Sequence, residues 1–596
     1  MSEIRINSIR IKNYRSFGEE QYFVFPNKDY KKPIAIVGYN NSGKTNLMNC
    51  LLCGIGNKFI QTNTFEKHDL HNLNYNNHIN IQIALQGSEF EQEYTDKYGN
   101  KQKMNKSISG LYEIFTELDD TELKSGMTPS MFGMNKHYNI FYINFHNIKE
   151  EISTKKTSWG NLTSFLAKHI KKIVDSDTSM ASKQQDYEQE VKVATEKVLL
   201  NSTLSSFVSK IKENYATNLR DNNCEVSFGL PDYEDIFLQM IFKVGLNGDK
   251  ESLIPIDHFG DGYISMFVMA VIQSIAETNI DDKCLFLFEE PESFLHENHQ
   301  EYFYKMVLCN LSERGHQVVY TTHSDRMIDI FDTKSIIRIE FDENTKQTVK
   351  KYNNVGNFNP TLPTDANGQE IITLENFNSF IKSVEPNLNK ILFSRKVILV
   401  EGPNDILAYK SSIENEVERI KKNKKFAETY LSFLNIAILV HHGKATAHIL
   451  IDLAKHFGLD YFVINDWDFD TNFITPLSKF GNESDLKQDD LYLKEGLEDR
   501  SSTSKGMVTT NWKLINSAGL GNIHFNIPKI EKVLGYPSDD KNSLAILNIV
   551  KGITNLSETF FPQKLRNYLE LNNLTNTVDS TIEPTFSQVM PDELPF

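Results

Sequence analysis

Two short apolar runs in the last third of the chain each stop abruptly at carboxylates. The runs are residues 396–400, read K-V-I-L-V, and residues 461–464, read Y-F-V-I, and both have the length of a strand. The carboxyl ends of parallel strands meet at one edge of a sheet, so the acids that follow them are expected to cluster. Such a cluster can hold two divalent cations and present an activated water to a phosphodiester. The acids concerned are Glu401, Asp405, Asp466 and Asp468.

A second chemical signature lies near the amino end of the chain. Residues 38–45 read G-Y-N-N-S-G-K-T, a G-x4-G-K-T phosphate loop, between an apolar strand at 34–37 and a helical run at 46–52. The glycines permit a tight turn, backbone N–H groups hold phosphate, the lysine reaches the outer phosphates, and the threonine ligates magnesium. The sequence therefore predicts an ATP site. The nucleotide-binding candidates are Gly38, Asn41, Gly43, Lys44 and Thr45.

Two later segments supply the remaining parts of such a site. Apolar residues 285–288 lead into Glu289 and Glu290, which is the layout of a Walker B element. Glu289 is expected to hold magnesium through water, and Glu290 to orient or deprotonate the attacking water. Residues 318–320 then lead to His323, which resembles the switch histidine of ABC-type ATPases that senses the γ-phosphate.

Two motifs resemble further parts of ATPases of this kind. The G-D-G sequence at 260–262 resembles the ABC signature element, which contacts the nucleotide of a partner subunit. Asp261 stands where a serine is common, and its negative charge near a triphosphate argues against tight ATP sandwiching or fast turnover. Residues 11–17 resemble the opening of recombination-repair ATPases of the SMC and RecF kind, in which an arginine approaches the nucleotide. Arg15 is either that arginine or a surface charge.

The acids of the last third resemble the Toprim fold of topoisomerases, primases and a class of nucleases. In that fold the first strand delivers a glutamate, here Glu401, and the third delivers a D-x-D pair, here Asp466 and Asp468. With the ATP-binding module upstream, the chain resembles the overcoming-lysogenisation-defect (OLD) family of ATPase–nucleases, which includes phage-defence effectors. The resemblance implies an ATP-regulated DNA endonuclease that uses Mg²⁺ or Mn²⁺ and forms a homo-oligomer, either a dimer or a dimer of dimers. Whether a helicase, or a reverse transcriptase with a non-coding RNA, is a partner stays open.

The same resemblance extends the candidate metal site. Asp405 matches the second acid that OLD-type nucleases place shortly after the glutamate, and Asp470 is either a further ligand or a solvated turn acid. Residues 525–531 and 541–545 resemble the OLD tail, in which an acid and a lysine complete the site. The residues so assigned are Glu531 and Lys541, with Lys505 as the rival lysine.

The predicted fold class is α/β, with an ABC-type ATPase domain that carries a helical insertion, followed by a C-terminal Toprim domain with a parallel sheet. The insertion has apolar residues at helical spacing, and the resemblance implies that it serves dimerisation. The acidic segment 482–500 is predicted to be a mobile loop. The predicted domains are 1–146 and 223–350 for the ATPase, 147–222 for the insertion, 351–390 for a linker and helix, and 391–596 for the Toprim nuclease.

Composition bears on the partners and the compartment. The net charge of −16 argues against sequence-independent coating of DNA, because nonspecific affinity comes mainly from Lys and Arg. DNA stays a candidate substrate, since divalent cations at a carboxylate cluster reverse the local field. The longest apolar stretches, such as 264–276, fall short of the ~18 residues of a membrane span, so a soluble cytoplasmic protein is predicted.

Two other features favour structural roles, and two other functions stay open. Cys50 and Cys53 form the one C-x-x-C pair, which without a second pair predicts buried thiols rather than zinc. His441 and His442 are read as structural, because magnesium prefers oxygen ligands. A topoisomerase-like enzyme would use the same acids together with a nucleophilic tyrosine. A recombination-mediator or structural ATPase would bind DNA at its Toprim module without cutting.

Overall fold

The computed structural model divides into two compact units, Met1–Ile328 with Lys334–Val355, and Asp329–Thr333 with Gly356–Phe596. Both units combine helices with parallel strands, which confirms the predicted α/β class. The residues described are 3–55, 65–95, 101–106, 110–119, 122–127, 138–151, 243–245, 251–278, 283–364, 369–489, 502–536, 542–553 and 555–576, with parts of 183–213.

The first unit is organised around a six-stranded sheet in the order β15-β14-β3-β13-β12-β9. All neighbours run parallel except β14 and β15. The central strands are buried along their whole length, as expected of a parallel sheet that is covered on both faces. The strands are β3 (Ile34–Val37), β9 (Asn139–Asn144), β12 (Cys284–Glu289), β13 (Gln317–Thr321), β14 (Ile336–Asp342) and β15 (Gln347–Asn353).

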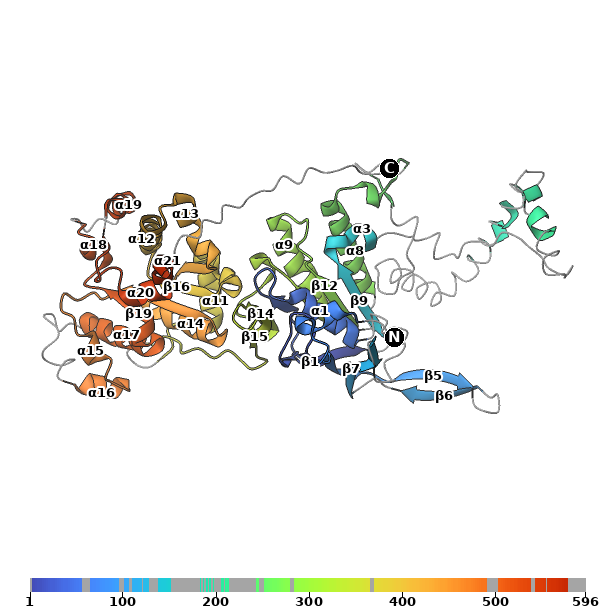
Figure 1. Ribbon diagram of the computed structural model, residues 1–596, viewed down its shortest axis with the longest axis horizontal. Coiled ribbons are helices and arrows are strands. Elements are labelled where there is room, and N and C mark those ends of the chain that lie inside the picture. Colours follow the sequence, from blue (N-terminus) through green and yellow to red (C-terminus); the bar gives the residue numbers. More distant parts are fainter. Residues whose placement is uncertain are drawn as a thin grey trace. The chain divides into compact units, whose positions relative to one another are not determined.

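A five-stranded antiparallel sheet, in the order β2-β1-β4-β7-β8, completes the core of this unit. Helix α1 (Lys44–Gly54) packs between the two sheets, because its Leu47 and Leu51 share one buried cluster with Ile83 of β4 and Val319 of β13. Figure 1 shows β5 and β6 as a two-stranded arm. The strands are β1 (Ile4–Lys12), β2 (Gln21–Val24), β4 (Asn80–Gly87), β5 (Phe90–Thr95), β6 (Lys101–Lys106), β7 (Gly110–Asp119) and β8 (Glu122–Met127).

One long helix and several short elements complete the first unit. The long helix α8 (Asp261–Thr278) begins at the G-D-G motif, and α9 (Glu297–Phe303) follows the Walker B strand. The others are α3 (Ile148–Glu151), β10 (Lys243–Val244), β11 (Ile254–Pro255), the π-helical turn Tyr304–Cys309 and α10 (Asn310–Glu313).

The second unit contains a four-stranded parallel sheet in the order β17-β16-β18-β19. Because β17 and β18 lie on either side of β16, right-handed crossovers place the connecting helices α12 and α14 on opposite faces. The elements are β16 (Lys396–Val400), α12 (Pro403–Lys421), β17 (Ile436–Val440), α14 (Lys444–His456), β18 (Asp460–Asp466) and β19 (Ile523–Asn526).

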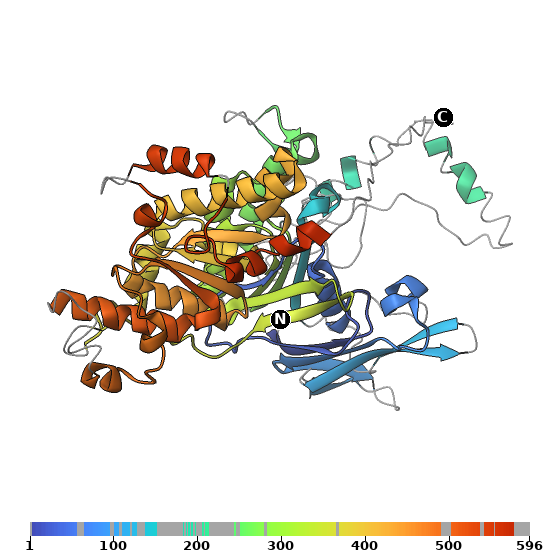
Figure 2. The ribbon, with the colours of Figure 1, turned by 60° about the vertical axis from the view of Figure 1, so that its left-hand side comes forward.

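Helices cover both faces of this sheet, drawn in orange to red in Figure 2. On one face α12 packs with α13 (Lys424–Phe433), α19 (Ser543–Gly552) and α21 (Leu571–Asn576), and Tyr409 and Ile413 of α12 belong to the core there. On the other face α14 packs with α17 (Ser502–Ala518). The remaining helices are α11 (Leu374–Val384), α15 (Ile474–Leu477), α16 (Glu483–Gln488), α18 (Ile530–Val533) and α20 (Gln563–Tyr568).

Most predicted strands are present, and one predicted loop is wrong in part. Segment 482–500 was expected to be mobile throughout, yet 483–488 forms helix α16, whose N-cap Asn482 accepts a hydrogen bond from the Asp485 N–H. Most of the predicted helical insertion lies outside the described residues, and the predicted domain bounds stay predictions. Among the helices described, none is long and apolar enough to span a membrane.

Candidate nucleotide and metal sites

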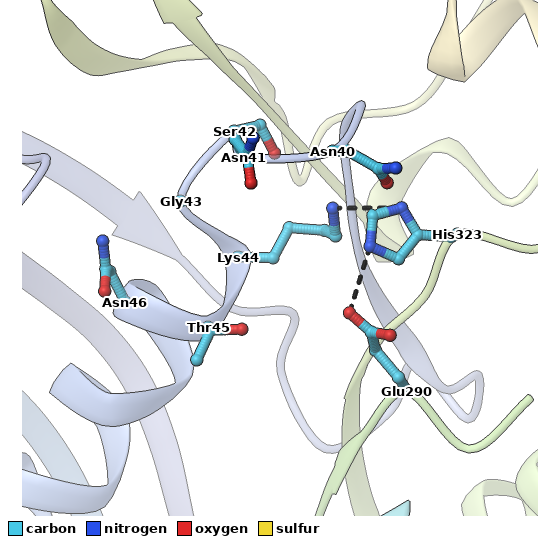
Figure 3. A pocket seen from close by; sticks show the side chains of 9 residues that line it. All are labelled: Asn40, Asn41, Ser42, Gly43, Lys44, Thr45, Asn46, Glu290 and His323. Carbon is cyan, nitrogen blue, oxygen red and sulfur yellow. Dashed lines mark hydrogen bonds and ion pairs between the residues drawn. The ribbon is translucent and has the colours of Figure 1, made fainter. Parts of the chain in front are cut away.

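The phosphate loop joins β3 to α1 in a conformation that needs its glycines. Gly43 has a φ of 98° and Asn41 a φ of 65°, both in the left-handed region. A Cβ added at Gly38 would collide with the carbonyl oxygen of Ile339. The loop borders a pocket of about 520 Å³ that is drawn in Figure 3. Its lining residues are Asn40, Asn41, Ser42, Gly43, Lys44, Thr45, Asn46, Glu290 and His323.

Lys44 is buried and points across this pocket. Its Nζ donates to the carbonyl oxygens of Gly38 at 3.0 Å and Tyr39 at 3.1 Å, and lies 3.4 Å from His323 Nδ1. Burial lowers the pKa of the Lys44 ammonium to about 8, because the charged form has lost its water. The charges of Glu290 and Glu292 offset this effect only in part, and a phosphate in the pocket would favour the charged ammonium further.

Glu290 faces the same pocket from the end of the Walker B strand. Its Oε1 lies 3.0 Å from His323 Nε2, and its Oε2 lies 2.6 Å from His146 Nε2. The hydrogen bond from His323 is the main reason why the pKa of Glu290 falls to about 2. The neighbouring Glu289 is buried instead, with its Oε2 accepting from the Tyr142 hydroxyl at 2.7 Å. Of the two predicted acids, only Glu290 lines the pocket.

His146 was missed by the sequence reasoning. It lies two residues beyond β9, which pairs with the Walker B strand β12, so the two strands end side by side. The sequence does show a strand followed by a histidine. It does not show that this strand pairs with β12, so the contact with Glu290 could not be predicted. Long-range pairing of the strands therefore creates this contact.

Four other residues discussed in the sequence analysis lie near the ATPase core. Arg15 pairs with Asp69 at 2.8 Å, and its Nη1 lies 3.5 Å from Asn46 Oδ1 at the start of α1. Asp261 pairs with Lys149 at 3.1 Å. Cys50 and Cys53 are buried thiols on α1, as predicted.

In the second unit the predicted acids lie at the carboxyl edge of the parallel sheet. Glu401 directly follows β16, and its Oε2 accepts from the Asp466 N–H and from Asn465 Nδ2, each at 3.2 Å. Asp405 lies in the first turn of α12, where its Oδ2 accepts from the Gly402 N–H at 2.7 Å. Asp466 ends β18.

The electrostatics of Asp466 show how closely these acids are gathered. Burial, followed by the charges of Asp405 and Glu401 and then of Glu531, raises the pKa of Asp466 to about 8. One of its oxygens accepts from the Ile530 N–H at 2.9 Å. Within the described part of the chain, no group of three or more His, Cys, Asp or Glu side chains is arranged to hold a metal ion.

Asp468 contacts two lysines that were not predicted as site residues from the sequence. Its Oδ2 forms an ion pair with Lys444 Nζ, and its Oδ1 lies 3.9 Å from Lys529 Nζ. The available signal was the G-K pair that follows strand β17. Of the other predicted residues, Asp470 is exposed, Lys505 lies on α17, and Lys541 falls outside the described residues.

Two buried side chains, those of Asn526 and His441, lie at the carboxyl edge of the sheet beside the acids. Asn526, at the end of β19, accepts from the Tyr409 hydroxyl at 2.9 Å and places its Nδ2 3.5 Å from Asp466. His441 is fully buried, its Nδ1 lies 3.1 Å from the Gly443 carbonyl oxygen, and burial lowers its pKa to about 4. The imidazole of His441 is therefore neutral near pH 7, in keeping with a structural role.

Comparison with protein families agrees with this architecture. The AAA ATPase domain family matches residues 5–328, which is more than half of the chain. The TOPRIM domain of overcoming lysogenization defect protein-like sequences matches residues 392–468. The predicted order, an ATPase followed by a Toprim domain, is thereby confirmed.

Several curated proteins are similar to the chain. The OLD nuclease of Thermus scotoductus is 23% identical over 318 residues, 52% of this chain and 51% of that protein, so the chain spans about half the length of this relative. The Old nuclease of Escherichia phage P2 is 22% identical and covers 79% of this chain and 78% of its own length. Endonuclease GajA of Bacillus cereus is 22% identical over 70% of this chain and 68% of its own length.

Among solved structures, the Smc head domain of Pyrococcus furiosus bound to ScpA aligns with 58% of this chain and 96% of its own, at 13% identity and a TM-score of 0.33. The family models and the curated relatives lead to the same assignment. The chain belongs to the overcoming lysogenization defect (OLD) family, with an AAA ATPase domain followed by an OLD-like Toprim domain.

Proposed function

We propose that this protein is an ATP-regulated DNA endonuclease that hydrolyses phosphodiesters at the carboxyl edge of the Toprim sheet with divalent cations. The observation that carries the proposal is the environment of Asp466, whose pKa is raised to about 8 by burial and by three neighbouring acids. Acids crowded in this way at a strand end favour binding of a cation. The names of the curated relatives, two OLD nucleases and an endonuclease, support the same activity.

The donor set suits magnesium or manganese. The candidate ligands are all carboxylates, and hard divalent cations prefer oxygen. Mg²⁺ keeps several waters and takes one or two protein carboxylates together with substrate phosphates, so it does not require three protein ligands in one place. When bound, the ions would supply Lewis acidity to the attacking water and to the leaving oxygen. The proposed ligands are Glu401, Asp405, Asp466 and Asp468, with Asp470 and Glu531 as further candidates.

The chain's own groups would hold these carboxylates in place. Backbone N–H groups of Asp466 and Ile530 orient Glu401 and Asp466, and the Gly402 N–H orients Asp405. Fixed donors of this kind keep the acids in position before substrate arrives. Lys541 is proposed to neutralise charge on the reacting phosphate.

ATP would bind in the pocket of the first unit. Lys44 and Thr45 would hold its phosphates and their magnesium with Glu289, Glu290 would orient the attacking water, and His323 would sense the γ-phosphate. We propose a homo-oligomer with DNA as its substrate and, from the family resemblance, a setting in phage defence.

The proposal is tested with purified full-length protein and both supercoiled and linear DNA. Reactions contain Mg²⁺, Mn²⁺ or EDTA, each with and without ATP, and ATP hydrolysis is followed in the same samples. Metal-dependent nicks or breaks that EDTA abolishes are expected, and the ATP arm shows how nucleotide regulates them. Intact DNA in every condition, with ATP hydrolysis present, would overturn the proposal in favour of an ATPase that does not cut.

A further inference from the structure

We propose that Lys444 is a built-in counter-cation of the Toprim site. In the metal-free protein its ammonium neutralises Asp468, and a divalent cation that takes this carboxylate releases the ammonium toward the substrate phosphate. This inference rests on the proposed nuclease function and assigns a role to a residue outside the predicted ligand set.

The ion pair is enclosed and asymmetric. Lys444 and Asp468 have side chains that are 11% and 19% exposed. Lys529, at 3.9 Å from the other carboxylate oxygen, is 57% exposed, so its charge is largely screened by water. Lys444 is therefore the principal cation on Asp468 in the described structure.

The carboxylate is the fixed partner of this pair. Asp468 has a φ of 65°, and its N–H donates to the Pro528 carbonyl oxygen at 2.8 Å. The preceding Trp467 is fully buried, its indole donates to the Thr471 carbonyl oxygen at 2.9 Å, and its own carbonyl oxygen accepts from Asn511. A carboxylate on so constrained a turn stays in place, whereas the four-carbon stem of a lysine can move.

The carboxylates near Asp468 favour replacement of the Lys444 ammonium by a divalent cation. Asp466, next to the same turn, senses the negative charges of Glu401, Asp405 and Glu531. A divalent cation therefore gains more from this edge than a single ammonium does. The two cations repel each other at short range, so metal at Asp468 displaces Lys444.

The released ammonium stays close to the reaction. Lys444 begins α14 after the turn 441–443 that follows β17, and β17 is paired with β16 and therefore ends at the same sheet edge as Glu401. A substrate phosphate at that edge carries the negative charge that the ammonium has lost. Lys444 would then leave its ion pair with Asp468 and stabilise negative charge on the reacting phosphate.

The test measures divalent-cation binding without DNA. Full-length Lys444→Met is titrated with Mg²⁺ and with Mn²⁺ by calorimetry and by thermal unfolding, next to wild type. The variant should bind metal roughly tenfold more tightly, because its carboxylate has lost a competing charge. Its DNA cleavage should nonetheless fall by about 10²–10³-fold, because the phosphate loses its cation.

Two controls separate this role from a structural one. Lys444→Arg keeps the charge and should restore the metal affinity of wild type, and Lys529→Met should leave it unchanged. In Asp468→Asn, the further change Lys444→Met should not alter metal affinity, because the two residues act through one contact. A thermal unfolding transition like that of wild type reports that each variant is folded.

The outcomes distinguish this inference from the proposed function. If wild type neither binds divalent cations nor cuts DNA, the nuclease proposal itself fails. If wild type does both and Lys444→Met has the same metal affinity as wild type, the counter-cation role is overturned. If Lys444→Met does not fold, the charge-keeping Lys444→Arg and the Asp468→Asn pair decide the question in the same way.

Discussion

Two carboxylates that are expected to serve hydrolysis have pKa values shifted in opposite directions. His323 holds the pKa of Glu290 down to about 2, whereas burial and neighbouring acids raise the pKa of Asp466 to about 8. Glu290 is thus ionised at any physiological pH, and Asp466 is protonated unless a cation replaces its proton. The environment of each acid, more than its residue type, sets what it can do.

Asp466 makes the stability of the metal-free protein depend on pH. Its ordinary pKa is 3.8, so between about pH 4 and 8 the folded state holds a proton that the unfolded state lacks. Raising the pH through this window should lower the melting temperature, and Mg²⁺ should raise it more at pH 8 than at pH 6. Thermal unfolding in EDTA and in Mg²⁺ measures both effects. Asp466→Asn should flatten the pH dependence, and an unchanged slope in that variant would refute the explanation.

Glu290 should be required for ATP turnover but not for ATP binding. Glu290→Gln removes the proton acceptor and should lower the rate of phosphate release by about 10²–10⁴-fold. Nucleotide binding, measured by calorimetry, should persist because Lys44 and the loop are untouched. Glu297→Gln is the matched control, since that side chain is 72% exposed on α9. Equal turnover in the two variants would mean that Glu290 takes no part in hydrolysis.

Motifs with fixed local spacing could be predicted at the residue scale, but contacts between distant residues could not. The phosphate loop and the acids after β16 and β18 are read from consecutive residues. His146 meets Glu290 across 144 positions, at the ends of two paired strands, and Lys444 meets Asp468 across 24, beyond the ends of two strands that flank β16. Which strands are neighbours is decided by the packing of the whole sheet, so one sequence does not reveal these pairs.

At the scale of elements, buried strands were predicted well because they are continuous apolar runs. Strand β3 has the predicted bounds, and β16 and β18 begin and end within two residues of the predicted runs. The hairpin of β5 and β6 was missed, since its residues are mostly polar and carry no apolar run. The helix after the phosphate loop begins at Lys44, two residues earlier than predicted, because the preceding glycine allows the helix to begin directly after the turn.

The turn between β17 and α14 should depend on its glycine. Gly443 has a φ of 120°, which other residues rarely adopt, although no atom lies within 4 Å of the position of an added Cβ. Gly443→Ala should therefore lower the free energy of unfolding by about 1–3 kcal/mol through backbone strain alone. Chemical denaturation measures this change. Gly481→Ala, which also has open space but no positive φ, is the control, and equal stabilities of the two variants would contradict the account.

At the scale of the whole molecule, the chain combines two units with separate cores and separate chemistry. The phosphate loop, Walker B strand and His323 all belong to the first unit, and the Toprim acids belong to the second. Because the net charge is −16, DNA could bind at the acidic edge of the Toprim sheet only if divalent cations neutralise the carboxylates there. Each activity should therefore be removable without loss of the other chemistry.

The most direct test of this account measures ATP hydrolysis and DNA cleavage side by side in wild type and Glu401→Ala. Glu401 lies in the second unit, on the strand end next to Asp466, and has no part in the nucleotide pocket. The account predicts that Glu401→Ala abolishes metal-dependent cleavage and hydrolyses ATP at the rate of wild type. Cleavage that survives the substitution, or loss of both activities in a folded protein, would contradict it.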